Sequence, residues 1–188
     1  MNMKNFRLNK LALPVFFLVY SLVLLFIARQ NVIWEDELYS LDTTSGSFLR
    51  ALTQSYTFEG QPPFYFMVLN IWRFVSDSVW WARILSIAFT LGAGVYFHLL
   101  IKYLIPGKYQ LIFTILFLIN PFVVWHATEV RLYSMMLFLS SASMYYYIKV
   151  FYYQSRRKSA LHIYLMIALF GVFTQYLFTF LIFGQVLA

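Results

Sequence analysis

The sequence predicts an all-α protein, a polytopic transmembrane helical bundle with about five spans. Hydrophobic residues make up 62% of the chain and charged residues only 11%, whereas an average globular domain has about 25% charged residues. Several uncharged runs are long enough to cross the roughly 30 Å hydrocarbon core of a bilayer. Lysines and acidic residues alternate between the connections that join these runs. These three observations together exclude an ordinary soluble domain.

The predicted spans follow from the uncharged runs. The first run follows three basic residues and lacks a small-residue cleavage site behind it, so we expect an uncleaved first span rather than a signal peptide. The last run is longer than a single span needs. The five runs are Leu11–Ala28, Ile84–Ile101, Tyr109–Thr128, Leu132–Ile148 and Ser159–Ala188.

A further apolar segment, Pro63–Val75, is too short to span. It carries Asn70, Arg73 and Asp77 along one face of a helix, which is typical of a helix lying in the membrane interface. If this segment does not span, every lysine lies on one side of the membrane and all seven acidic residues lie on the other. The positive-inside rule then puts the N-terminus in the cytoplasm. We expect a multi-pass protein of the plasma (inner) membrane whose active face is periplasmic or extracellular.

The predicted outer loop covers residues 30–80 and contains two interfacial helices. Apolar residues recur at helical spacing over Glu37–Thr53, which predicts the first helix, and Gln61-Pro62-Pro63 precedes the second. A second, short outer loop covers residues 126–131. Residues 1–188 form one transmembrane domain, and because the chain stops in or just after an apolar helix, we expect it to be the N-terminal part of a longer protein.

The excess of basic residues, 14 against seven acidic ones, suits an anionic membrane surface and not a nucleic acid. With no cysteine in the chain, a thiolate metal site and a thiol nucleophile are excluded. No paired-histidine spacing or glycine-rich phosphate loop is present. A divalent cation is possible at the outer carboxylates, but no spacing requires one and we assign no metal ligand.

Two outer clusters contain candidate functional residues. Asp36, in Trp34-Glu35-Asp36-Glu37, is either the N-cap of a helix or a carboxylate held at the bilayer surface as a general base or metal ligand. Glu129 either pairs with Arg131 at a helix end, or acts with Arg131 and Tyr133 on a substrate. The planar fork of arginine matches phosphate oxygens, which favours the arginines of the outer side as phosphate ligands.

Four motifs occur together in one order. They are Asp36-Glu37, Gln61-Pro62-Pro63-Phe64-Tyr65, Ala82-Arg83-Ile84-Leu85-Ser86, and Asn120-Pro121-Phe122 leading to Glu129-Val130-Arg131-Leu132-Tyr133. In this order and topology the chain resembles the N-terminal half of the glycosyltransferase C superfamily. It is most similar to the branch that contains protein O-mannosyltransferases and the lipid A aminoarabinose transferase.

The resemblance implies transfer of a sugar from a polyprenyl-phosphate donor to a hydroxyl of a lipid, glycan or protein acceptor, with inversion at the sugar. Asp36 matches the essential aspartate of the family, and Asp36 and Glu37 are the expected catalytic residues. The expected substrate-binding residues are Gln61, Arg83, Glu129, Arg131 and Tyr133. The aminoarabinose branch has a lysine where this chain has Gln61, which argues against a lipid A-type acceptor.

Two alternatives from other classes remain. A multi-pass transporter or lipid flippase also needs many spans, although no predicted span here contains Asp or Glu. A non-catalytic assembly subunit could keep the same fold without the activity. A second set of spans followed by an outer domain would favour the transferase.

Overall fold

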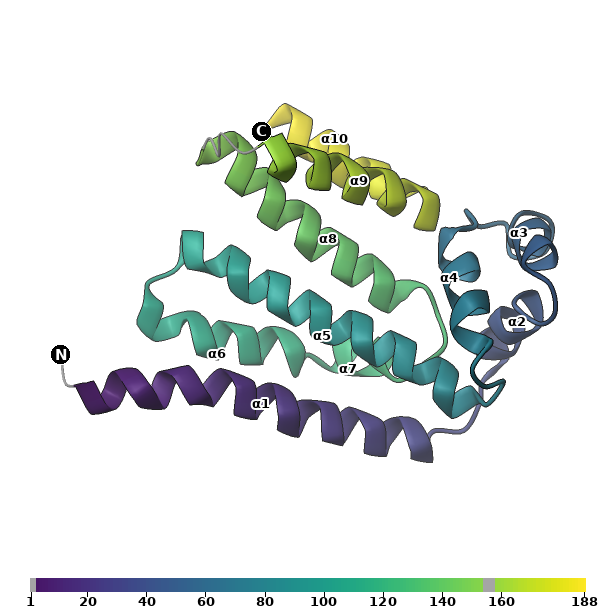
Figure 1. Ribbon diagram of the computed structural model, residues 1–188, viewed down its shortest axis with the longest axis horizontal. Coiled ribbons are helices and arrows are strands. Elements are labelled where there is room, and N and C mark those ends of the chain that lie inside the picture. The colour runs from purple at the N-terminus through teal and green to yellow at the C-terminus, as the bar shows by residue number, and fades with distance from the viewer. Residues whose placement is uncertain (1–2, 154–157) are drawn as a thin grey trace.

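The computed structural model describes residues 3–153 and 158–188, with the backbone alone for residues 3–10. The described residues form helices joined by turns and loops, without a strand, as the sequence predicts. Figure 1 shows the longer helices lying along one direction, with three short helices gathered at one end. The helices are α1 (Met3–Gln30), α2 (Glu35–Thr43), α3 (Phe48–Thr57), α4 (Phe64–Arg73), α5 (Val79–Leu104), α6 (Gly107–Leu118), α7 (Pro121–Ala127), α8 (Tyr133–Tyr147), the π-helix η1 (Ile148–Tyr152), α9 (Lys158–Thr174) and α10 (Phe178–Leu187).

Two helices, α1 over Leu11–Gln30 and α5, are long and apolar enough to cross a membrane, and a third span is counted if the bent pair α6 and α7 acts as one. Large apolar side chains of α1, including Leu11 and Phe26, are more than 60% exposed, as expected for a surface that contacts lipid. Membrane association is therefore supported. The predicted bundle of five spans is not confirmed.

The predicted third span is interrupted. α6 and α7 are inclined by 59° to each other because Pro121 cannot donate the backbone hydrogen bond that a continuous helix needs. The side chain of Asn120 instead accepts a hydrogen bond from the backbone nitrogen of Phe122 at 2.9 Å and so caps α7. The chain therefore turns at Asn120, shortly before the predicted second outer loop at residues 126–131.

The predicted last segment, Ser159–Ala188, forms two helices instead of one. The chain turns between Thr174 and Phe178, and α10 runs back beside α9 (Figure 1). The ring of Phe178 lies where a Cβ atom on Gly171 would stand, at only 2.3 Å. Because Gly171 has no side chain, α10 can approach α9 this closely, which explains a turn that hydropathy alone does not predict.

The predicted helix Glu37–Thr53 is also wrong in its extent. The chain breaks into α2 and α3 at Gly46, whose φ of 84° lies in the left-handed region that glycine adopts without strain. Ser47 then caps α3 by accepting a hydrogen bond from the backbone nitrogen of Arg50. The period of the apolar residues continues across this break, so the pattern alone does not reveal it.

The short helix predicted at Pro63–Val75 is present as α4. Of its predicted polar stripe, Asp77 lies beyond the end of α4 and is 90% exposed, whereas Asn70 and Arg73 do not point to water. Asn70 is buried and donates hydrogen bonds to the carbonyl oxygens of Thr44 (2.9 Å) and Gly46 (3.1 Å). Arg73 donates to the carbonyl oxygen of Leu41 at 2.6 Å and to the hydroxyl of Thr44 at 2.8 Å. The polar stripe therefore holds the turn between α2 and α3 against α4.

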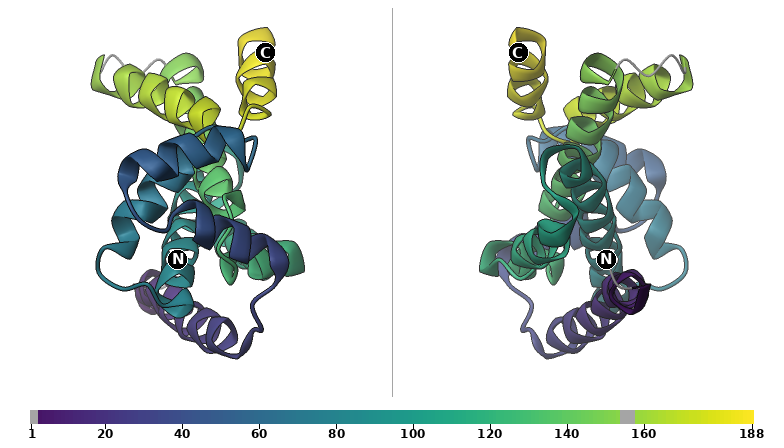
Figure 2. Two further views of the ribbon diagram at one scale, coloured as in Figure 1. Left: turned by 90° about the vertical axis from the view of Figure 1, so that its right-hand side faces the viewer. Right: turned by 90° about the vertical axis from the view of Figure 1, so that its left-hand side faces the viewer.

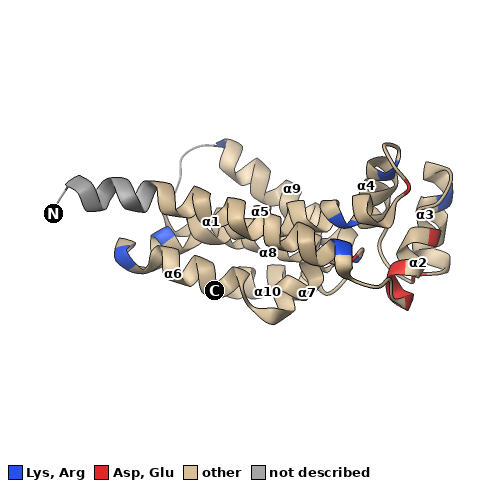
Figure 3. Cartoon of the chain, turned by 90° about the horizontal axis from the view of Figure 1, so that it is seen from below, with Lys and Arg blue, Asp and Glu red and all other residues tan. Residues whose placement is uncertain are grey.

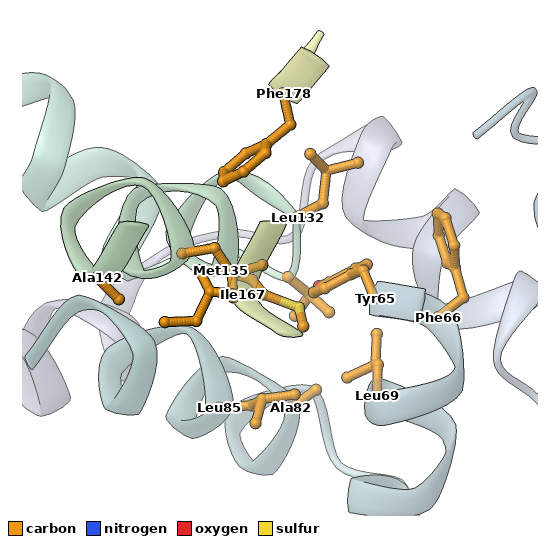
Figure 4. Packing of buried hydrophobic residues seen from close by; sticks show 12 residues of the cluster. Tyr65, Phe66, Leu69, Ala82, Leu85, Leu132, Met135, Ala142, Ile167 and Phe178 are labelled. Atoms are coloured by element: carbon orange, nitrogen blue, oxygen red, sulfur yellow. The ribbon is translucent and has the colours of Figure 1, made fainter. Parts of the chain in front are cut away.

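The main apolar core lies where α4, α5, α8, α9 and α10 meet. Figure 4 shows Tyr65 and Leu69 of α4 packed toward Leu85 of α5 and Met135 of α8, with Phe178 of α10 above them. A second cluster joins α1, α5, α6 and α7 around Leu24 and Leu118. Because α5 contributes residues to both clusters, it joins the two halves of the bundle and holds α4 against them.

Charged residues are separated along the bundle. Figure 3 shows the acidic residues gathered with some basic residues at the end formed by α2–α4, and further basic residues at the opposite end, where α5 turns into α6. Arg156 and Arg157, which lie between the fourth and fifth uncharged runs of the sequence, are outside the described residues. The separation agrees with the predicted placement of basic and acidic connections on opposite sides of the bundle.

Candidate functional site

The candidate site lies at the acidic end of the bundle. It is formed by the first turn of α2, the first turn of α5, and the connection from α7 to α8. Figure 2 shows α2–α4 covering this end of the bundle. The site brings together segments that are about 50 to 100 residues apart in the sequence, through contacts such as that between Glu37 and Val130.

Arg83 and Glu37 form a buried ion pair. Arg83 Nε donates to Glu37 Oε1 at 2.9 Å, and Nη2 donates to Oε2 at 2.6 Å. Both side chains are almost fully buried, with 4% and 1% exposed. The other N–H groups of Arg83 donate to three carbonyl oxygens, that of Ala28 in the last turn of α1 and those of Asn31 and Val32 just after it. These bonds use all five donors that a guanidinium has.

Both carboxylate oxygens of Glu37 also accept hydrogen bonds from within the chain. Besides Arg83, Oε1 accepts a hydrogen bond from the backbone nitrogen of Val130 at 2.8 Å, and Oε2 accepts a longer one from that of Trp34 at 3.4 Å. A saturated, buried pair ties the end of α1 to α2, α5 and the α7–α8 connection. This geometry favours structural roles for Glu37 and Arg83, since neither keeps a group for a substrate.

Arg131 lies beside Asp36 in a more open arrangement. Its Nη1 donates to Glu59 Oε2 (3.2 Å), to the Ser40 hydroxyl (3.0 Å) and to the carbonyl oxygen of Asp36 (3.2 Å). Nη2 makes no hydrogen bond within the described residues and lies 4.0 Å from Asp36 Oδ2. Burial lowers the pKa of Arg131, but the charge and hydrogen bond of Glu59 outweigh it and raise the pKa overall. The guanidinium thus stays charged and keeps donors for an anion.

Asp36 is the most accessible carboxylate of the site. Its side chain is 37% exposed, against 5% for Glu59 and for Glu129. The interpretation of Asp36 as an N-cap is wrong, because α2 begins at Glu35 and Trp34 occupies the cap position. Its carboxylate accepts no hydrogen bond from the part of the chain that the structure describes. Capping therefore does not account for this carboxylate, which lies in the acidic first turn of α2.

Glu129 pairs with His126 and not with Arg131. One carboxylate oxygen contacts His126 Nδ1, while the other oxygen is buried without a hydrogen-bond partner among the described residues. Glu129 lines a cavity of about 350 Å³, which is also lined by Asn31, Trp34 and the Glu37–Arg83 pair. The expected Glu129–Arg131 pair at a helix end is therefore absent from the described structure, and Arg131 contacts Glu59 instead.

Two predicted residues lie apart from Asp36. The ring of Tyr133 contacts that of His126 in a tilted arrangement, with ring centroids 4.5 Å apart, and Tyr133 lines a second cavity of about 270 Å³. The backbone nitrogen of Gln61 donates to the carbonyl oxygen of Ser55, and its side-chain oxygen is buried without a partner among the residues described. The structure thus unites Asp36 with Arg131, and Glu129 with Tyr133 through His126, but does not join Gln61 to either group.

Sequence reasoning missed two residues of the site, Glu59 and Tyr65. Glu59 was recognisable only as one of seven acids in a basic chain. The Tyr65 hydroxyl is buried, and burial raises its pKa, as do the charges of three glutamates, while that of Arg131 lowers it. Its oxygen has no hydrogen-bond partner in the described part of the chain. Tyr65 precedes a buried apolar run, so its sequence context resembles that of any core residue.

No three side chains of the types that bind metals are grouped closely enough to hold an ion among the described residues. Asp36 and Glu59 both approach Arg131, whose positive charge occupies the space between their carboxylates. A divalent cation at the outer carboxylates stays a prediction.

Comparisons of the chain with protein-family models, with curated proteins and with solved structures found no match. The class that fold and site define is thus a helical membrane-associated protein with a polar cluster at one end. Family, activity and substrate rest on the residues of that cluster.

Proposed function

We propose that the protein is a membrane glycosyltransferase that moves a sugar from a polyprenyl-phosphate donor to an acceptor hydroxyl on the outer face, with inversion. One observation carries the proposal: the accessible carboxylate of Asp36, without a hydrogen-bond partner among the described residues, lies 4.0 Å from the guanidinium of Arg131. A base for the acceptor and a cation for the leaving group then stand side by side. Both lie at the end of the apolar helices, and the proposed spans would put that end at the depth of a lipid-linked phosphate.

The proposed reaction is a single displacement. The acceptor oxygen bonds to the anomeric carbon while the bond from that carbon to the phosphate oxygen breaks, and the hydroxyl proton passes to Asp36. Polyprenyl phosphate leaves with the bonding electron pair. Arg131 Nη2 stabilises the charge that develops on the phosphate, as preorganised donors do at transition states. Arg83 cannot replace Arg131 here, because its five donors are occupied.

A five-span topology in the plasma (inner) membrane belongs to the same proposal. α8 continues directly into η1, with 15 and five residues, which together extend over roughly 30 Å. α6 with α7 supplies a bent span, and α9 with α10 supplies the last apolar segment. With these spans Asp36 and Arg131 share the outer side.

The function is tested with the full-length protein in membranes and a radiolabelled polyprenyl-phosphate sugar. We expect the donor to be consumed and the label to appear in an acceptor. A protein that binds the donor but never releases polyprenyl phosphate would fit the non-catalytic assembly subunit. Movement of the intact donor across the bilayer without loss of its sugar would fit the flippase.

Arg131→Lys should raise the KM for the donor by about tenfold. Lysine keeps the charge beside Glu59 but loses the planar fork, so about one charge-assisted hydrogen bond, roughly 1.5 kcal/mol, is lost. Donor titrations in membranes measure the change. The matched control is Arg50→Lys on α3, an arginine in an exposed pair with Asp42, whose KM should stay within twofold. An unchanged KM in Arg131→Lys would remove Arg131 from phosphate binding.

The topology predicts which thiols an impermeant reagent reaches. The chain has no cysteine, and Thr57 on α3 and Ser159 on α9 are both exposed. Thr57→Cys should react in intact cells, whereas Ser159→Cys should react only after the membrane is permeabilised. Labelling of both positions in intact cells would contradict the proposed spans.

A further inference from the structure

A basic cavity lies at the end of the bundle opposite Asp36, where α5 turns into α6. Its volume is about 310 Å³. Lys102 and His98 of α5 and Lys108 of α6 line it, together with Gly107. Leu13 of α1 and Leu111 of α6 complete an apolar side. Figure 3 shows basic residues at this end and the acidic residues at the other.

The positive charge of this cavity has no counter-charge in the chain. All seven acidic residues fall between Glu35 and Glu129, in the outer connections of the acidic end. The Lys108 ammonium lies 4.7 Å from the centre of the Tyr109 ring, a contact that does not neutralise it. Two lysines that face one cavity repel each other unless an anion joins them. Both lysines are exposed, so solvent screens part of this repulsion, and an anion from outside the chain would relieve the rest.

The start of α6 adds hydrogen-bond donors to the two lysines. The residue at the cap position is Pro106, and no side chain caps the helix. The first backbone N–H groups of a helix have no partner within it, and only that of Tyr109 is joined to Pro106, at 2.9 Å. A Cβ atom on Gly107 would meet nothing within 4 Å. Gly107 thus leaves the space beside these N–H groups open.

We propose that this cavity binds the phosphate of an anionic phospholipid headgroup. The lysines and the N–H groups of Gly107 and Lys108 recognise the phosphodiester oxygens, which is the usual chemistry of basic pockets between membrane helices. Leu13 and Leu111 border the polar part and leave an apolar path for the acyl chains. A free inorganic ion would use only the polar half of this cavity. The site does not depend on the proposed transferase activity, because it lies at the other end of the bundle.

The test is a lipid titration of the full-length protein in mixed detergent micelles, read by native mass spectrometry. Phosphatidylglycerol is the probe, and phosphatidylcholine is the uncharged reference. We expect one phosphatidylglycerol to bind more tightly than phosphatidylcholine. Lys102→Gln with Lys108→Gln should weaken its binding about 30-fold, roughly fivefold for each lysine near an anionic headgroup.

The matched control removes two other lysines from the same end, through Lys149→Gln with Lys158→Gln, which do not line the cavity. This control should keep its affinity within twofold. Equal losses in both double variants would mean general attraction to anionic surfaces and would overturn the site. Equal affinities of the wild type for the two lipids would also overturn it. So would full displacement of the lipid by inorganic phosphate at the same concentration.

Discussion

Replacing Asp36 by asparagine is expected to reduce sugar transfer by about 10²–10⁴-fold, the usual effect of removing a general base. The amide keeps the shape of the side chain but cannot take the proton of the acceptor hydroxyl. Because Trp34 and not Asp36 occupies the cap position of α2, the change removes no cap, only a first-turn negative charge and its half-exposed pair with Arg131. That loss costs at most about 1 kcal/mol of stability. Transfer in membranes, normalised to the amount of folded protein, measures the effect.

Glu35→Gln is the matched control for Asp36→Asn. Glu35 lies one residue earlier in the same turn, and its carboxylate is exposed and bonded to the Tyr39 hydroxyl. This variant loses the same charge near the helix start and should keep transfer within a few fold. Near-normal transfer by Asp36→Asn would exclude Asp36 as the base. The buried carboxylate of Glu129, with one oxygen free of hydrogen bonds in the described structure, would then be the next candidate.

Arg83→Met is expected to destabilise the fold by about 3–5 kcal/mol, the usual cost of removing one partner of a buried ion pair. The change would leave Glu37 charged and buried, and would leave the carbonyl oxygens of Ala28 and Asn31 without their donor. Thermal unfolding in detergent micelles, followed by circular dichroism, measures the loss. Arg50→Met, in the exposed pair with Asp42, should cost less than about 1 kcal/mol.

A double-mutant cycle separates the structural role of Arg83 from a role in phosphate binding. When Glu37→Gln accompanies Arg83→Met, the loss should be smaller than the sum of the single losses, because no buried charge remains alone. A folded Arg83→Met protein that had lost only donor affinity would contradict this. In that case Arg83, and not the accessible Arg131, would bind the phosphate.

The helical class and the ends of several helices could be predicted from the sequence. The low charge and the long apolar runs predict a lipid environment. There a helix is the simplest structure in which every backbone N–H and C=O group has a hydrogen-bond partner. The prolines at Pro62 and Pro63 correctly mark the start of a short helix, since their effect on the backbone is local. Gly46 and Gly171 are less informative in sequence. Whether a glycine breaks a helix or admits a neighbouring ring depends on what packs against it.

The separation of charge along the bundle could also be read from the sequence, because the order of apolar runs fixes which connections share an end. The residue with which each charged side chain pairs could not be predicted from the sequence. Spacing suggested that Glu129 pairs with Arg131, two residues away, and that Asn70 and Arg73 face water. In the folded chain Glu129 contacts His126, and the stripe of α4 binds the α2–α3 turn.

Only the tertiary structure distinguished the two carboxylates of Asp36-Glu37. Adjacent residues of a helix point about 100° apart, so one of them faces the interior and the other the edge of the site. Glu37 is buried by Arg83 from α5 and by the backbone of Val130, whereas Asp36 remains accessible beside Arg131. The sequence alone shows that positions 36 and 37 both carry a carboxylate. Which one is neutralised depends on donors 46 and 93 residues away, and those are placed only when the helices pack.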